Sequence, residues 1–185
     1  MTSAIRMALS AISNAREKLR DMTLELVHEE LERILNCSLQ EITSRFAGIH
    51  LCKQETCLSD DVCTIHTILE ASHRTVLLLY ADVSLLVRLA QNIMHREEVS
   101  ERDIQDVATE YFNVVCGRIA AGIYQTSHVA SRFQTPSFFA GRYLPDGDVC
   151  CQCMVSFRGE HDESVRLVCM RTQIPNSCSL PSERV

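Results

Sequence analysis

Long hydrophobic runs and clusters of positive charge are both missing from this chain of 185 residues. No apolar run reaches the roughly 20 residues that cross a bilayer, so no transmembrane helix is expected. Lys and Arg total 18 against 24 Asp and Glu, which gives a formal net charge of -6 and disfavours nucleic acid or an anionic membrane as a partner. The stretch 1–20 fits an amphipathic helix better than a signal peptide. We therefore expect a cytoplasmic protein.

Several motifs of common enzyme classes are also missing. The chain has no G-x-x-x-x-G-K or G-x-G-x-x-G run, so nucleotide binding is not indicated. It has no G-x-S-x-G element, so serine hydrolysis has little support. His66, His73, His95 and His128 do not stand at metal-ligand spacing, and we interpret them as surface or partly buried structural residues.

Cysteine, by contrast, is abundant, with ten copies. Cys150, Cys151 and Cys153 fit the geometry of a structural zinc site poorly. On a strand, we expect Cys151 and Cys153 to face one side and Cys150 the other. The preferred interpretation is that the cysteines are small apolar residues in a reducing cytosol, and metal or redox chemistry is the alternative.

The pattern of apolar residues predicts helices followed by strands. Helical spacing covers 2–20, 22–36, 82–94 and 100–126, the third capped by Asp82 or Ser84 and the last by Ser100 with Asp103. Alternating or β-branched runs at 62–69 and 75–82 predict one hairpin, and the runs CCQCMVSF and SVRLVCMR predict a second. A short strand is possible at 49–52, and LPDGD at 144–148 predicts a turn. The sum is an α+β domain with helices packed on a mostly antiparallel sheet.

The longest predicted helix carries a narrow polar stripe. Asp106, Glu110 and Asn113 are four and three residues apart, and Gly117 follows one turn further on. At about 100° per residue they share one face, opposite the predicted buried face of Ile104, Ala108, Tyr111, Val115 and Ile119. A polar stripe on a helix is most often only the solvated face. The residues that follow the stripe favour a functional role instead.

Twenty-two residues separate Asn113 from Pro136, which opens the run PSFFAG that ends at Gly141. The series Asp106, Glu110, Asn113, Pro136, with Gly117 four after the Asn, resembles the signature of the CheC/CheX/FliY family of chemotaxis phosphatases. The resemblance covers about residues 60–172. The element occurs once here, as in the CheX-like branch, and not twice as in CheC-type members.

The resemblance implies a CheX-like fold, to which we assign a phosphatase domain at 22–172. The extra N-terminal helix at 1–21 departs from the family pattern, and the tail at 173–185 is expected to be flexible because it lacks apolar periodicity. The resemblance also implies a homodimer, a phosphorylated CheY-like response regulator as partner, and no cofactor beyond Mg²⁺ supplied by that regulator. Asn113 and Glu110 would be catalytic. Asp106 and Gly117 would contact the partner, and Pro136 and Gly141 would have structural roles.

In that scheme the Asn113 amide orients a water in line with the phosphorus of an acyl phosphate, as a glutamine does in some GTPases. An amide has negligible basicity near neutral pH, so Asn113 is no general base. By the same resemblance, Glu110 pairs with the regulator's active-site lysine. The alternative is a non-catalytic module that keeps this fold and binds a response regulator or another signalling protein.

Overall fold

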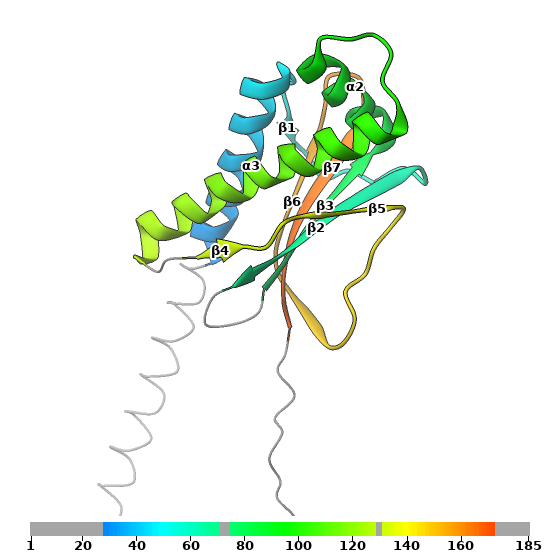
Figure 1. Cartoon of the computed structure of the whole chain (residues 1–185). Helices are drawn as coiled ribbons and strands as arrows, with labels where there is room; N and C mark the ends of the chain where they lie inside the picture. The colour runs from blue at the N-terminus through cyan, green and yellow to red at the C-terminus, as the bar shows by residue number, and fades with distance from the viewer. Residues whose placement is uncertain (1–27, 71–74, 129–130, 173–185) are drawn as a thin grey trace, which may run out of the picture.

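The computed structural model describes residues 28–70, 75–128 and 131–172 (Figure 1). The predicted helix at 2–20, the first part of the one at 22–36 and the predicted tail at 173–185 lie outside these residues. The predicted boundary at residue 21 lies outside them as well. Within the described ranges no helix is long and apolar enough to cross a membrane.

Seven antiparallel strands form one sheet, in the order β1-β6-β7-β3-β2-β4, with β5 also paired to β2. The strands are β1 (Cys52–Lys53), β2 (Val62–Glu70), β3 (Thr75–Asp82), β4 (Arg132–Phe133), β5 (Ser137–Ala140), β6 (Val149–Arg158) and β7 (Ser164–Thr172). The β2–β3 and β6–β7 pairs confirm both predicted hairpins. The predicted strand at 49–52 is wrong in extent, since only Cys52 of that range pairs, in the two-residue β1.

The central strand β3 is buried along its whole length. Alternate residues such as Leu77 and Leu79 face the helices, while Leu78 and Tyr80 join a second apolar cluster on the other side of the sheet. Burial on both faces explains why the sequence TVLLLYAD is almost continuously apolar, as expected for a strand inside a layered fold.

Three helical segments lie on one face of the sheet: residues 28–47, α2 (Val83–Met94) and α3 (Glu101–Ser127). Figure 1 shows α3 crossing the sheet with the segment 28–47 beside it and α2 near the first turns of α3. The larger part of the core lies between these helices and the sheet. The predicted α+β architecture, with helices on an antiparallel sheet, is therefore confirmed.

The first described helix is longer than predicted. It continues past residue 36 to residue 47, because Leu39, Ile42 and Thr43 extend its buried face across the mixed stretch CSLQEITSRF. Gly48 follows with φ of +64°, a left-handed conformation that favours glycine after a helix, and its N–H donates to Ser44 O at 3.0 Å.

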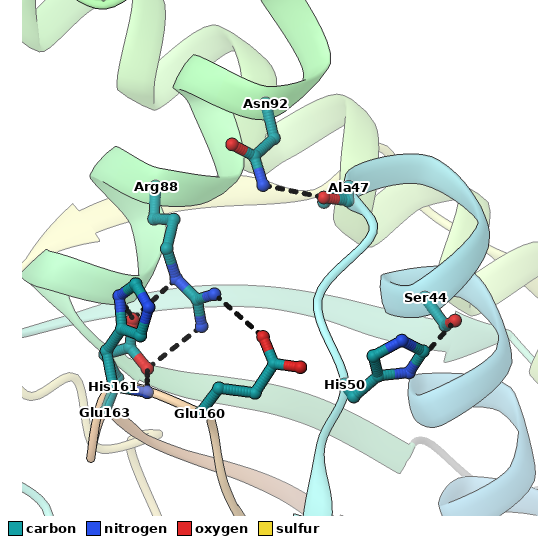
Figure 2. Close-up of polar contacts among 8 residues, drawn as sticks. All are labelled: Ser44, Ala47, His50, Arg88, Asn92, Glu160, His161 and Glu163. Atoms are coloured by element: carbon teal, nitrogen blue, oxygen red, sulfur yellow. Dashed lines mark hydrogen bonds and ion pairs between the residues drawn. The ribbon is translucent and has the colours of Figure 1, made fainter.

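A buried ion pair anchors the β6–β7 turn to α2 (Figure 2). The Arg88 guanidinium lies 2.7 Å from Glu163, whose side chain is only 4% exposed, and 3.3 Å from Glu160 at the rim. A Cβ on Gly159 would come within 2.5 Å of a Glu163 carboxylate oxygen, so a larger residue there would displace the carboxylate from Arg88. The pair fixes the hairpin turn against the helix layer.

Asp82 occupies the N-cap position of α2 but makes no capping hydrogen bond. The prediction is therefore right about the position of the cap, and the side chain does not act as one. Its carboxylate instead accepts from Ser59 N and Oγ, at 3.1 and 2.8 Å, and from Ser164 N at 2.7 Å. The buried carboxylate joins the loop before β2 to the start of β7.

Candidate functional site

The helix α3 begins with the predicted capping box. Ser100 Oγ accepts from Asp103 N, and the Asp103 carboxylate accepts from Ser100 N at 2.9 Å. Ser100 Oγ also donates to the Asp103 carboxylate at 2.7 Å, and this bond together with the one from Ser100 N holds the pKa of Asp103 below its ordinary value. The helix ends at Ser127, one residue beyond the predicted end, with His128 in a left-handed conformation. A single rigid element of 27 residues therefore carries the whole polar stripe.

The buried face of α3 matches the prediction at Ala108, Tyr111, Val115 and Ile119, while Ile104 is only partly buried. Phe112 and Cys116 extend that face towards the sheet. The four stripe residues Asp106, Glu110, Asn113 and Gly117 are all exposed, on the side of the helix away from the core. The helix therefore presents the stripe to solvent along about three turns.

The stripe has few contacts of its own. Asp106 faces Arg102 one turn earlier at 3.8 Å, in a pair so exposed that it adds little stability. Among the described residues, the side chains of Glu110 and Asn113 have no hydrogen-bond or ion-pair partner. A Cβ built on Gly117 would meet no atom within 4 Å. The fold itself therefore requires none of these side chains. It also does not require a glycine at position 117.

The two predicted structural residues lie on either side of β5. Pro136 is buried at the start of the strand, and Gly141 follows its end with φ of +104°, a conformation that disfavours other residues. Gly141 O accepts from Thr64 Oγ1 at 2.6 Å, which ties the end of β5 to β2. Both residues therefore flank the strand, and neither lies in the exposed stripe.

A pocket of about 320 Å³ borders the stripe on the side of the segment 28–47. Its lining is almost wholly apolar, and the carboxylates at its edge are Asp106 and Glu110. The lining side chains come from three helices: Phe46, Ile93, Val107, Tyr111 and Val114. Phe46 was missed from the sequence because the helix was predicted to end at residue 36. No local pattern marks its contact with α3.

A larger apolar cavity of about 400 Å³ lies towards the other end of α3, lined by residues such as Leu35, Ile119, Ile123 and Phe133. It contains none of the stripe residues. Its volume exceeds that of the pocket at Glu110, but it brings together no set of groups suited to acid–base or water-positioning chemistry. We therefore place the candidate site at the stripe.

The cysteines form no candidate metal site in the described part of the chain. The predicted placement of Cys151 and Cys153 on one face is wrong, because an irregularity at Gln152 shifts the register. Cys151 pairs with Met170 and Cys153 with Cys169, and adjacent residues of β7 face opposite sides of the sheet. Burial raises the pKa of Cys153 to about 11 and that of Cys169 to about 12, so both remain protonated near neutral pH.

Comparison with known proteins agrees with this fold. The family model described as chemotaxis phosphatase CheX matches residues 63–155. The CheX structure from Desulfovibrio desulfuricans superposes with a TM-score of 0.62 at 14% identity, over 76% of this chain and 99% of that one. CheX from Vibrio vulnificus gives 0.62 at 18% identity, over 76% and 95%. CheX in a complex with CheY, BeF₃ and Mg²⁺ from Borrelia burgdorferi gives 0.61 at 12% identity, over 76% and 97%. No curated protein matches the chain.

The family model and the fold place this chain in the class formed by the CheC, CheX and FliY chemotaxis proteins. The family match covers 63–155, half of the chain, and it includes the whole stripe, Pro136 and Gly141. This chain belongs to the chemotaxis phosphatase CheX family.

Proposed function

We propose that this protein is a hydrolase that removes the phosphoryl group from the phospho-aspartate of a CheY-like response regulator, in chemotaxis or related two-component signalling. The observation that carries the proposal is the placement of Glu110 and Asn113. They stand one helical turn apart, exposed and without partners among the described residues, on the motif that the family match includes. Two polar side chains so placed are available to a partner protein.

Hydrolysis of the regulator's acyl phosphate requires few catalytic groups from this protein. An acyl phosphate carries a good leaving group, so hydrolysis needs chiefly a water held in line with the phosphorus. The Asn113 carbonyl oxygen accepts a hydrogen bond from that water and fixes its position. Mg²⁺ in this scheme belongs to the regulator's own phosphorylation site. A hundredfold acceleration corresponds to about 2.7 kcal/mol, which one oriented water and one ion pair are able to supply.

Glu110 acts through the partner. Side chains three apart on a helix have Cβ atoms about 5–6 Å apart, so a lysine bound by the Glu110 carboxylate lies next to the water held by Asn113. The ion pair sets the register of the two proteins and thereby orients the amide. Asp106 extends the acidic surface, and Gly117 allows the partner's backbone to approach the helix.

The test compares phosphate loss from the phosphorylated regulator with and without the protein. Asn113→Ala should reduce kcat by about a hundredfold, towards the regulator's intrinsic rate, while the Kd for the regulator bearing BeF₃ and Mg²⁺ stays within about twofold. Glu110→Gln should lower kcat/KM and raise that Kd.

Two control variants remove the same chemical groups away from the site. Gln125→Ala removes another exposed amide of α3, and Glu98→Gln removes another exposed carboxylate. Both should retain the parent rate. A parent protein that binds the regulator but never accelerates phosphate loss would instead show a non-catalytic binding module.

A homodimer and a cytoplasmic location are part of the same proposal. The family membership supports both. For the homodimer, Met154 on β6 adds an exposed apolar side chain on the sheet, away from the stripe.

A further inference from the structure

The apolar pocket beside Glu110 leaves large hydrophobic side chains partly exposed to solvent. Phe46 is half exposed, at 51%, although a large aromatic side chain gains about 1.5–3 kcal/mol from full burial. Its neighbours in the pocket, Val107 and Val114, are likewise only partly buried. The pocket shares Glu110 with the proposed catalytic pair, so its apolar wall continues directly from the polar stripe.

The position of Phe46 is fixed by hydrogen bonds on both sides of it in the chain. Thr43, one turn earlier, bonds the buried Tyr111 hydroxyl at 2.5 Å, with Tyr111 forming part of the pocket. Asn92 Nδ2 on α2 donates to Ala47 O at 2.7 Å, directly after Phe46 (Figure 2). The helix ends at once in the left-handed Gly48. Three helices therefore hold the backbone at Phe46 in one place, and its side chain lines the same pocket as Glu110.

The charge at the edge of the pocket indicates what it receives. Asp106 and Glu110 are the two carboxylates that line it, and the remaining lining is apolar. An occupant that places an apolar side chain in the pocket and a cation against the rim satisfies both features. A second copy of this chain is disfavoured, because its net charge of -6 would face two further carboxylates.

We propose that this pocket, with Phe46 as its principal docking residue, receives an apolar side chain of the response regulator. That side chain is a neighbour of the regulator lysine to which Glu110 of this chain binds. This inference rests on the proposed function for the identity of the partner. Phe46 belongs to the segment 28–47, which lies outside the residues 63–155 that the family model matches. The pocket acts on docking, and Asn113 acts on hydrolysis.

The experiment separates those two roles. Phe46→Ala should raise both the Kd for the regulator bearing BeF₃ and Mg²⁺ and the KM for the phosphorylated regulator by about tenfold, with kcat at saturation within about twofold. Asn113→Ala should show the opposite division. Phe46→Leu, which keeps an apolar side chain, should restore most of the affinity.

The control is Leu144→Ala, which removes a still more exposed apolar side chain, at 74%, from the loop after β5. It should leave Kd, KM and kcat unchanged. Thermal unfolding of each variant checks that the fold is intact, as expected for half-exposed positions.

The outcomes distinguish a failure of the docking pocket from a failure of the proposed function. If Phe46→Ala leaves Kd and KM within about twofold while Asn113→Ala abolishes catalysis, the docking pocket is wrong and the proposed function stands. If Phe46→Ala weakens binding but the parent protein never accelerates phosphate loss, the pocket stands and the catalytic function is wrong. A parent protein that does not bind the regulator at all overturns both.

Discussion

The hydroxyl oxygens of Thr43 and Tyr111 lie 2.5 Å apart in the interior, between the helical segment 28–47 and α3. Thr43 Oγ1 donates its proton to Leu39 O at 2.6 Å, so the Tyr111 hydroxyl is the donor in the bond to Thr43. Burial raises the pKa of Tyr111 above its ordinary value, which keeps that donor protonated. The bond joins the helix that carries the stripe to the helix that carries Phe46.

Tyr111→Phe removes this bond and keeps the ring. We expect a loss of about 1 kcal/mol in the free energy of unfolding, measured by urea titration, since a buried acceptor loses its donor. Tyr124→Phe is the matched control, because the Tyr124 side chain is half exposed on the same helix. Equal stabilities of the two variants would contradict a structural role for the Thr43–Tyr111 bond.

The stripe was predictable from sequence because its information is local. Asp106, Glu110, Asn113 and Gly117 follow the period of one helix, and that period places them on one face whatever packs behind it. The two hairpins were predictable for the same reason, since alternation and turn residues are adjacent in the chain.

Features that depend on contacts between distant segments were not predictable. Phe46 joins the site only because the segment 28–47 packs beside α3. Asp82 accepts a hydrogen bond from Ser164 of the neighbouring strand β7 and does not cap its own helix. The irregularity at Gln152 places Cys151 and Cys153 on opposite faces of the sheet, because a single extra residue changes which side chains point inward. Period alone carries no signal for any of these.

Two glycines of α3 give a paired prediction about packing and docking. A Cβ at Gly117 meets open space, whereas one at Gly122 would come within 2.9 Å of Ile34 Cγ2 in the segment 28–47. Gly117→Ala should therefore raise the free energy of unfolding by roughly 0.5–1 kcal/mol through helix propensity. Gly122→Ala should lower it by roughly 1–3 kcal/mol through overpacking against a β-branched side chain.

The same pair tests the role of Gly117 in docking. Gly117→Ala should raise the KM for the phosphorylated regulator while the protein itself becomes more stable, because the added methyl group obstructs only the partner. A more stable variant with unchanged KM would show that the partner's backbone does not approach this turn of the helix.

The partly buried imidazole of His66 predicts how stability depends on pH. His66 on β2 stacks on Tyr143 with ring centroids 4.1 Å apart, and its Nδ1 atom is buried without a partner among the described residues. Burial lowers the pKa of His66 below its ordinary value of 6.5. Well above pH 6.5 the imidazole is neutral in the folded and unfolded states alike, so it adds no pH dependence there. As the pH falls below 6.5, the unfolded chain takes up a proton that the folded chain resists, and the free energy of unfolding decreases until the folded pKa is reached.

His66→Phe keeps a ring against Tyr143 without a titrating group. Urea titrations between pH 7.5 and pH 5 should therefore show a smaller loss of stability for this variant than for the parent protein. Parallel pH profiles for the two proteins would mean that His66 is protonated in the folded state as readily as in the unfolded chain.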